Sequence, residues 1–317
     1  MSLSKDSKGI VNHPITPQDA AIVGEMRTQS APAKGKLLGV AARPIFDEII
    51  GHTSAPAGVE FREDTIGGVP GWWAVPAGAQ TQTEGSLLYL HGGWYAWGTA
   101  KAYRNFVGHI AARAGIPAFA PDYRLAPEHP FPAAVQDAEA VYRGLIERGS
   151  RRIAIVGDSA GGGLALVLTA LVVGKLQSIG TAPVGTVALS PLNDLTLSGR
   201  SWDTREAADP YFTKAQGTNM APLYVGNHDP KDPLISPVFG DLAGLPPIRI
   251  HVGEDEVLLD DSLRYVERAV AAGVDARVDV WQGMPHVFLS AAGQLAAADE
   301  ALEAVGTFLA ERLGRSR

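Results

Sequence analysis

The chain has 317 residues, 46% of them hydrophobic and 19% charged, so it is long enough to bury one large core. Its formal net charge of −7 offers no general attraction to nucleic acid or to an anionic membrane surface. No apolar run in the sequence reaches the length that spans a bilayer. The absence of cysteine excludes disulfide bonds, a thiol nucleophile and cysteine metal sites, and the histidines form no HxxxH or HExxH pair. We therefore expect no metal, no nucleic acid and no membrane partner.

The N-terminal part of the chain is predicted to consist of helices joined by polar turns, up to about residue 55. Thr16 is a typical N-cap residue, and Pro17 follows it at the first helical position. The first residues hold no apolar segment of the kind that starts a secretory signal, so we expect a cytoplasmic location. Residues 60–78 predict a hairpin, formed by two strand-like runs around Gly67 and Gly68.

From residue 86 onward, short apolar runs alternate with amphipathic helical stretches. The runs cover residues 86–92, 116–123, 151–157, 185–190, 248–253 and 276–281. This alternation predicts an α/β fold with a mostly parallel sheet covered by helices on both faces. Residues 193–245 interrupt it with a proline-punctuated segment that includes aromatic residues, and a gap of this length in a compact α/β domain predicts a lid.

A glycine-rich stretch connects the run at 151–157 to the next helical stretch. Residues 157–161, Gly-Asp-Ser-Ala-Gly, fit the G-x-S-x-G pattern at a strand-to-helix junction. The glycines permit a sharp turn that lifts the serine above the sheet, and the helix that follows directs free N–H groups toward the same place. Ser159 is therefore the candidate nucleophile.

A serine hydroxyl needs a base, and the base needs a carboxylate to orient it. In folds with this serine turn the chain order is serine, acid, histidine, and the histidines after Ser159 are His228, His251 and His286. His251 lies within a predicted strand, and His228 lies in the irregular segment. His286 lies in the loop between the last strand and the final helix, so we take it as the base.

The acid is expected just after the strand at 248–253. Several carboxylates follow one another there: Glu254, Asp255, Glu256, Asp260 and Asp261. One of them should orient the histidine, while the others favour the first turn of the next helix. Spacing alone does not choose among them.

A glycine pair follows the strand at 86–92. Gly92 and Gly93 leave the backbone uncovered, so that their N–H groups can approach a substrate oxygen. Together with the N–H of Ala160, which follows the candidate nucleophile, they are predicted to form an oxyanion hole.

Three motifs occur together in this chain: HGGW at 91–94, DYRLAPEHPFPAA at 122–134 and GDSAGG at 157–162. With these motifs the sequence resembles the hormone-sensitive-lipase-like family of α/β-hydrolases, bacterial carboxylesterases, over about residues 60–310. The resemblance implies an α/β-hydrolase core over residues 56–317. It also implies a helical cap, built from residues 1–55 and an insertion at about 193–245, and no metal or organic cofactor.

The resemblance also implies roles for individual residues. Ser159 matches the nucleophile and His286 the base. Gly92, Gly93 and Ala160 match the oxyanion-hole donors.

The family's acid is usually an aspartate in a D-P-L-x-D pattern. Aligned without gaps, this pattern falls on residues 256–260 and implies Glu256, whereas a shift of one residue would imply Asp255. A glutamate can serve, because only a carboxylate contact to Nδ1–H of the histidine is required. We therefore predict Glu256, with Asp255 as the alternative.

The substrate pocket is predicted from aromatic and apolar residues near these motifs and in the insertion. The candidates are Trp94, Tyr95, Tyr211, Phe212, Met220, Val287 and Phe288. Asp158 is a further candidate through its charge beside the nucleophile, although hydrogen bonds to neighbouring loops are the simpler interpretation. Arg124 and Glu128 are predicted to hold their loop by charge-assisted hydrogen bonds, and His91 is predicted to be structural.

The predicted function is a serine carboxylesterase that hydrolyses short- to medium-chain acyl esters through an acyl-enzyme intermediate. A lactone hydrolase would use the same groups, and the sequence does not separate the two. A second alternative is a non-catalytic receptor of the same fold. The plant gibberellin receptors resemble this family but lack the catalytic histidine, whereas His286 is present here. The expected partner is a small-molecule ester, and the resemblance leads us to expect a homodimer.

Overall fold

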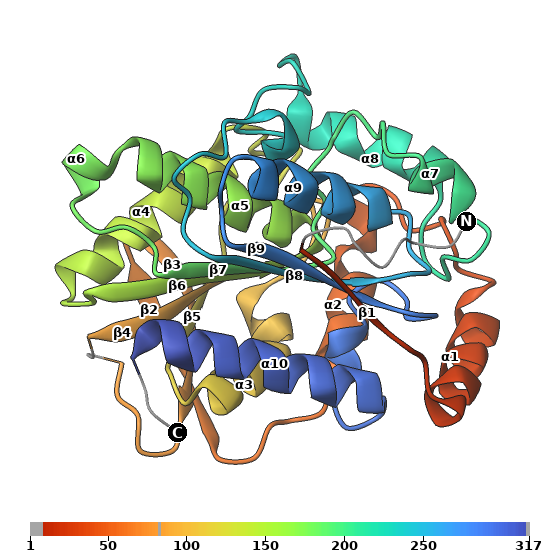
Figure 1. Cartoon of the computed structure of the whole chain (residues 1–317), viewed down its shortest axis with the longest axis horizontal. Helices are drawn as coiled ribbons and strands as arrows, with labels where there is room; N and C mark the ends of the chain where they lie inside the picture. Colours follow the sequence, from red (N-terminus) through yellow and green to blue (C-terminus); the bar gives the residue numbers. More distant parts are fainter. Residues whose placement is uncertain (1–8, 82–83, 315–317) are drawn as a thin grey trace.

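The computed structural model of the chain describes residues 9–81 and 84–314. Its centre is a sheet with nine strands within these residues, in the order β1-β9-β8-β7-β6-β4-β5-β3-β2 (Figure 1). Neighbouring strands from β1 to β5 in this order are parallel, whereas β3 pairs antiparallel with both β5 and β2. The strands span β1 Ile10–His13, β2 Val59–Ile66, β3 Val69–Pro76, β4 Gly85–Leu90, β5 Ala118–Pro121, β6 Arg152–Asp158, β7 Gly185–Leu189, β8 Ile248–Gly253 and β9 Ala276–Trp281.

Helices cover both faces of the sheet (Figure 1). One face carries α3 Ala100–Ala114 and α10 Ala296–Leu313, and the other carries α4 Ala133–Glu147, α5 Ser159–Gly174 with the short α6 Leu176–Ile179, and α9 Leu259–Ala271. A sheet covered in this way needs strands that are apolar on both sides, and β4, β6 and β7 are buried along almost their whole length. Within the described part of the chain, no helix is both long enough and apolar enough to cross a membrane.

The predicted strands and the predicted hairpin are present. The six apolar runs form β4 to β9, and Gly67 and Gly68 turn the chain between β2 and β3 with φ angles of 59° and 81°. A Cβ atom at Gly67 would lie 2.2 Å from the carbonyl oxygen of Ala140, so this turn needs glycine both for its conformation and for its packing against α4. Thr16 caps the first helix as predicted, because its hydroxyl accepts a hydrogen bond from the Asp19 amide at 3.1 Å.

The edge strand β1 differs from the prediction of helices up to residue 55. Ile10–His13 pairs in parallel with β9. The His13 ring stacks on Trp281 at 3.9 Å, and its Nε2 lies 2.8 Å from Asp279 Oδ1. A strand of four residues is too short to show a two-residue hydrophobic period, and Asp279 lies 266 positions along the chain. The contacts that hold β1 are therefore not visible in the local sequence.

The two segments predicted to form a cap are joined to each other. The Gly35 amide donates a hydrogen bond to Tyr211 O at 2.9 Å, and Gln216 Nε2 donates one to Leu37 O at 2.8 Å. The first segment holds α1 Pro17–Ser30, the 3₁₀ turn η1 Val40–Ala42 and α2 Arg43–Gly51, and the second holds α7 Ser201–Thr204, α8 Lys214–Val225 and the 3₁₀ turn η2 Pro237–Phe239. A further 3₁₀ turn, η3 Phe288–Ala291, precedes α10.

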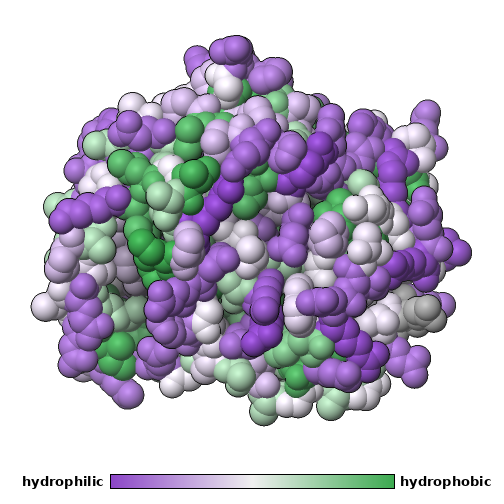
Figure 2. Space-filling view, turned by 180° about the vertical axis from the view of Figure 1, so that it is seen from behind, coloured by the Kyte–Doolittle hydropathy of each residue, from purple (hydrophilic) through white to green (hydrophobic). Residues whose placement is uncertain are grey.

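The first of these two segments exposes several apolar side chains to the surface. Leu38, Val40, Ile45 and Ile49 are 44%, 43%, 50% and 53% exposed, respectively. Seen from behind, the molecule shows apolar residues gathered in strips between hydrophilic ones (Figure 2). Another side of α2 carries Phe46, whose ring centre lies 5.5 Å from that of Trp97, so α2 presents apolar side chains to the core and to the surface.

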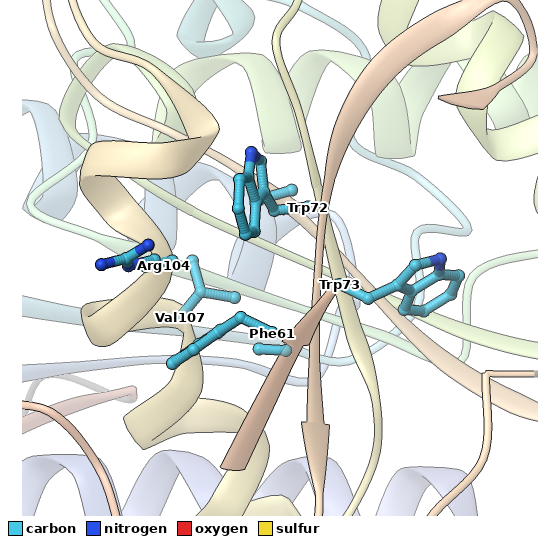
Figure 3. Close-up of a pocket in the computed structure, with 7 residues that line it drawn as sticks. Phe61, Trp72, Trp73, Arg104 and Val107 are labelled. Atoms are coloured by element: carbon cyan, nitrogen blue, oxygen red, sulfur yellow. The ribbon is translucent and has the colours of Figure 1, made fainter. Parts of the chain in front are cut away.

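A hollow in the antiparallel part of the sheet holds none of the predicted site residues (Figure 3). Trp72 and Trp73 project to opposite sides of β3, as neighbours in a strand do, and Trp72 lies on the side of α3. The Arg104 guanidinium carbon lies 5.8 Å from the ring centres of both Phe61 and Trp72. The hollow is thus bordered by aromatic and cation–π packing, which is a structural use of these residues.

Candidate active site

Ser159 lies at the junction of β6 and α5, at the carboxyl end of a central strand. Its φ angle is 52°, a left-handed conformation that non-glycine residues rarely adopt. Two glycines make the turn possible, since a Cβ at Gly157 would lie 2.2 Å from Gly161 O and a Cβ at Gly161 would lie 2.1 Å from Leu90 O. Because α5 begins at Ser159, the free N–H groups and the positive dipole end of that helix lie beside the serine.

Glu256 and His286 form a buried pair at the same edge of the sheet. Glu256 follows β8 and His286 follows β9, and both strands run parallel to β6. His286 Nδ1 lies 2.7 Å from Glu256 Oε2, and the two side chains are 7% and 0% exposed. Glu256 Oε1 accepts a hydrogen bond from the Gly253 amide at 2.6 Å, so both oxygens of this carboxylate are engaged.

The neighbouring carboxylates have other partners. Asp255 Oδ2 accepts a hydrogen bond from Arg27 Nη2 at 2.5 Å, and Asp255 Oδ1 lies 3.6 Å from Arg205 Nη1. The structure therefore places Glu256, and not Asp255, on the histidine. Of the remaining candidates, Glu254 pairs with Arg205, while Asp260 and Asp261 lie in the first turn of α9.

The charges around His286 connect it to the serine turn. Burial by itself disfavours the charged imidazolium, but Glu256, Asp209 and Asp158 outweigh burial and raise the pKa of His286 above 6.5. Asp158 is the residue directly before Ser159, so one of the charges that act on His286 comes from the serine turn. Ser159 Oγ and His286 are not hydrogen-bonded in this structure, and such contacts often tighten only when substrate is bound.

The backbone amides beside the serine that have no described acceptor differ at one position from the predicted oxyanion donors. The Gly92 amide donates a hydrogen bond to Asp158 Oδ1 at 2.9 Å, so the prediction that it faces a substrate oxygen is wrong. The amides of Gly93, Trp94 and Ala160 donate to no residue that the structure describes. Gly93 and Trp94 have φ angles of 115° and 57°, and tight turns of this kind can present successive N–H groups to an anion.

Asp158 holds the glycine loop and does not face substrate. Its Oδ1 also accepts a hydrogen bond from Tyr89 OH at 2.7 Å, and its Oδ2 accepts one from Tyr103 OH at 3.1 Å. A Cβ at Gly92 would lie 2.3 Å from Asp158 Oδ2, which explains the glycine there. Burial raises the pKa of Asp158 to about 6. The assignment of Asp158 as a substrate contact is therefore wrong, and the predicted hydrogen bond to the backbone of a neighbouring loop is confirmed at Gly92.

Three of the predicted pocket residues lie close to His286 or to each other. The Phe212 ring packs edge-on against His286 with ring centres 4.9 Å apart, and Trp94 packs against Phe212 at 5.8 Å. The Tyr211 ring lies 6.4 Å from that of Phe212. Trp202, which the sequence analysis missed, lies 6.3 Å from Trp94. Trp202 is 0% exposed and supports Trp94 from the core. We call Phe212 and Trp94 the aromatic wall, and it forms an apolar border beside the histidine.

Three other predicted pocket residues are core residues instead. Tyr95 is 1% exposed and stacks on Tyr224 at 3.7 Å. Phe288 is 1% exposed and packs against Trp281 at 5.5 Å. Met220 is 1% exposed as well. An aromatic or apolar residue near the site can face either the pocket or the core. Tyr224 and Trp281 hold Tyr95 and Phe288 in the core, and Met220 is buried within α8.

Two polar residues that the sequence analysis missed connect the parts of the site. Asp209, in the insertion, accepts a hydrogen bond from the Val257 amide at 2.9 Å, next to the acid. Ser190 Oγ donates to Glu256 Oε1 at 2.8 Å and accepts from the Val287 amide at 3.1 Å. Val287, predicted as a pocket wall, therefore contributes through its backbone. The sequence hint was weak: a serine at the end of a buried strand.

The remaining motif residues hold loops together, as predicted. Arg124 Nη2 lies 2.7 Å from Asp137 Oδ1, and Glu128 Oε2 lies 2.6 Å from Arg43 Nη2 on α2. His91 is fully buried, which lowers its pKa to about 4 and keeps the ring neutral. These contacts fix the loops that surround the serine.

Comparison with known proteins gives one consistent family. A family model described as an alpha/beta hydrolase fold matches residues 87–290. An acetyl-hydrolase from Streptomyces hygroscopicus is 38% identical over 270 residues, which cover 84% of this chain and 87% of the relative. The crystal structure of an esterase from the bacterial hormone-sensitive lipase family matches with a TM-score of 0.85 at 37% identity, over 95% of this chain and 99% of that one.

A second solved structure agrees with the first. EstE5, soaked with p-nitrophenyl butyrate, matches with a TM-score of 0.84 at 34% identity, over 95% of this chain and all of that chain. The family match at residues 87–290 includes the HGGW loop, the serine turn and His286. The chain belongs to the hormone-sensitive-lipase-like family of α/β-hydrolases.

Proposed function

We propose that this chain is a serine carboxylesterase that hydrolyses short- to medium-chain acyl esters through an acyl-enzyme intermediate. The observation that carries the proposal is the buried Glu256–His286 pair, with 2.7 Å between Oε2 and Nδ1. It lies at the same sheet edge as a serine held in a sharp strand-to-helix turn. A carboxylate on Nδ1 fixes the imidazole tautomer whose Nε2 accepts a proton. Esterases and an acetyl-hydrolase among the relatives support the same class.

In the acylation step, Ser159 Oγ attacks the ester carbonyl carbon while His286 Nε2 takes the hydroxyl proton. Hydrogen bonds from the amides of Gly93, Trp94 and Ala160 stabilise the negative charge that develops on the carbonyl oxygen. The carbonyl then re-forms, and the bond to the alkoxy oxygen breaks. The alcohol leaves with the proton from His286, and the acyl group stays on the serine.

In the deacylation step, a water molecule gives a proton to His286 and its oxygen attacks the acyl-serine carbonyl. The bond between the acyl carbon and Ser159 Oγ breaks, Ser159 Oγ takes the proton from His286, and the carboxylic acid is released. Throughout both steps Glu256 keeps its negative charge, which orients the imidazole and stabilises the imidazolium form.

The proposed substrate range rests on the aromatic wall of Phe212 and Trp94. Phe212 lies against His286, so an apolar acyl or alkoxy group bound near the base would contact aromatic carbon and not charge. Burial of such groups contributes about 0.8 kcal/mol per CH₂. The acetyl-hydrolase relative and the p-nitrophenyl butyrate soak of EstE5 support short acyl chains as the first substrates to try.

The direct test is hydrolysis of p-nitrophenyl esters from acetate to octanoate by the purified chain. We expect turnover with a kcat of about 1–10³ s⁻¹, highest among the shorter esters. A matched set of lactones tests ring opening by the same groups. If kcat/KM is higher for lactones than for every ester, the activity is that of a lactone hydrolase. If neither set is hydrolysed, the enzyme proposal is wrong, and a binding role is the better reading.

The rate of ester hydrolysis is expected to fall in acid, because His286 must be neutral to accept a proton. Since the surrounding carboxylates raise the pKa of His286 above 6.5, kcat/KM should increase with pH through a midpoint above that value and then level off. Initial rates with p-nitrophenyl butyrate between about pH 5 and about pH 9 measure this rise of kcat/KM, the acid limb of the pH profile. A midpoint clearly below the ordinary histidine value would contradict the assignment of His286 as base.

Three further expectations stay predictions of this proposal: a small-molecule ester as the partner, a homodimer, and a cytoplasmic location. Sedimentation of the purified chain and fractionation of the source cells measure the last two.

A further inference from the structure

Ser190 directly follows β7, the strand between β6 and β8. The residue is completely buried, and its φ angle is 47°. A buried serine in the left-handed region is uncommon, and such a conformation persists only where the surroundings determine it strongly. Its amide is fixed by a hydrogen bond to His251 O at 2.8 Å, so the position of the Ser190 side chain is set by the sheet.

The Ser190 hydroxyl lies between the acid and the loop of the base. Its oxygen accepts a hydrogen bond from the Val287 amide at 3.1 Å and lies 2.8 Å from Glu256 Oε1. A hydroxyl has one hydrogen to donate, and an ionised carboxylate can only accept. The hydroxyl hydrogen therefore points to Glu256, and the direction of both hydrogen bonds is determined.

The backbone of the histidine loop is strained at the residue that Ser190 holds. Val287 has a φ angle of 49°, which is a genuine outlier for a β-branched side chain. It directly follows His286, so any relaxation at Val287 would move the imidazole. The hydrogen bond from its amide to Ser190 Oγ is one of the contacts that keep this conformation in place.

We propose that Ser190 is a positioning residue for the reaction, whose hydroxyl holds the Glu256 carboxylate and the His286 loop in one fixed geometry. The inference rests on the proposed esterase function. Glu256 Oε1 has two donors, the Ser190 hydroxyl and the Gly253 amide, while Oε2 faces the imidazole. Ser190 thus acts through both members of the pair without contacting the reacting atoms.

Loss of the hydroxyl has a predictable effect on the pH profile. The negative groups that act on His286 are Glu256, Asp209 and Asp158. Without the Ser190 hydrogen bond, Glu256 Oε1 keeps only the Gly253 amide, and more of the carboxylate charge acts on the imidazole. The acid limb of kcat/KM should therefore move to higher pH, an effect that a purely structural role would not cause.

The experiment compares Ser190→Ala and Ser190→Gly with the wild type on p-nitrophenyl butyrate. Both variants should lose about ten- to hundred-fold in kcat, the range for a hydrogen bond to a charged group, with KM changed less than about threefold. Both should also show the displaced acid limb. Glycine tolerates the left-handed backbone without strain, so an equal loss in Ser190→Gly assigns the effect to the hydroxyl and not to the conformation.

The matched control is Ser86→Ala on β4. Ser86 is also completely buried, and its hydroxyl lies 2.8 Å from that of Ser150, in a hydroxyl pair that belongs to no part of the site. This variant should lower Tm while it keeps the kcat and acid limb of the wild type. An equal loss of kcat in Ser86→Ala would overturn the inference. So would a wild-type kcat together with a wild-type acid limb of kcat/KM in both Ser190 variants, provided that they are folded. If the wild type hydrolyses no ester, the proposed function fails, and this inference falls with it.

Discussion

Replacement of the nucleophile, Ser159→Ala, is expected to reduce kcat for ester hydrolysis by about 10⁴- to 10⁶-fold. Without Oγ no acyl-enzyme forms, and only slow attack by water remains, assisted by the backbone donors beside the serine. Alanine lacks only the Oγ atom of serine. It must adopt the same backbone conformation at this position, where the φ angle is 52°. The fold and Tm should therefore stay close to those of the wild type. Rates with p-nitrophenyl butyrate at enzyme concentrations high enough to detect single turnovers measure the loss.

Two controls separate loss of the nucleophile from loss of the fold. Ser178→Ala removes a surface hydroxyl that donates to Lys175 O at 3.0 Å, and it should leave kcat unchanged. An organophosphate should add one covalent group to the wild type, on the peptide that contains Ser159, and none to Ser159→Ala. If Ser159→Ala keeps more than about a tenth of the wild-type turnover, the nucleophile is another residue.

Glu256→Gln is expected to lower kcat by about 10⁴-fold. The amide carries no charge to stabilise the imidazolium, and it can present N–H instead of an acceptor to Nδ1, which favours the wrong tautomer of His286. Asp255→Asn is the matched control, because it removes a carboxylate from the adjacent position. It should change kcat by less than about threefold, since Asp255 contacts Arg27 and Arg205 and not the histidine.

Glu256→Gln and Asp255→Asn together decide which of these two neighbouring carboxylates orients His286. Equal stability of the two proteins, checked by thermal unfolding, shows that the rate difference is not a folding difference. Glu256→Asp adds a graded test, because it keeps the charge but shortens the side chain by one methylene. The kcat of Glu256→Asp should lie between that of the wild type and that of Glu256→Gln. If Asp255→Asn loses turnover and Glu256→Gln does not, Asp255 is the acid.

The strands and the serine turn could be predicted because their signals are local. Apolar runs bounded by glycine and proline predict β4 to β9, and a G-x-S-x-G pattern between a strand and a helix predicts the position of Ser159. The predicted histidine followed from chain order together with its place in the loop after the last strand, since parallel strands bring their carboxyl ends to one edge. These are properties of segments of ten to twenty residues, which the sequence displays directly.

The choice of the acid depends on contacts between distant segments. Glu256 and Asp255 are chemically similar neighbours, and spacing could not separate them. In the structure, Arg27 lies 228 positions from Asp255 and binds it, while Ser190 lies 66 positions from Glu256 and fixes it. Only the tertiary fold brings these partners together, and the family's usual pattern favoured Glu256 without giving the physical cause.

The error at Gly92 has a related origin. A glycine pair shows where backbone is uncovered, but it does not show where each amide points. Asp158, 66 positions away, accepts the hydrogen bond of the Gly92 amide, so that the proposed donors shift by one residue to Gly93 and Trp94. The prediction of Tyr95 as a pocket residue is wrong for a similar reason, because Tyr224 stacks on Tyr95 and holds its ring in the core.

The contact between α1 and the acid loop has a consequence for enzyme engineering. Arg27 donates to Asp255 Oδ2 at 2.5 Å, to Gly283 O at 3.3 Å, and also to Ala208 O. One side chain of the N-terminal helix thus touches the turn of the acid, the loop of the base and the insertion. A chimera that takes its first helix from a relative without this arginine would leave Asp255 beside Glu256 with only the longer contact to Arg205. The first helix and the acid turn therefore form a single exchange unit, because grafting either one alone removes the Arg27–Asp255 contact that joins them.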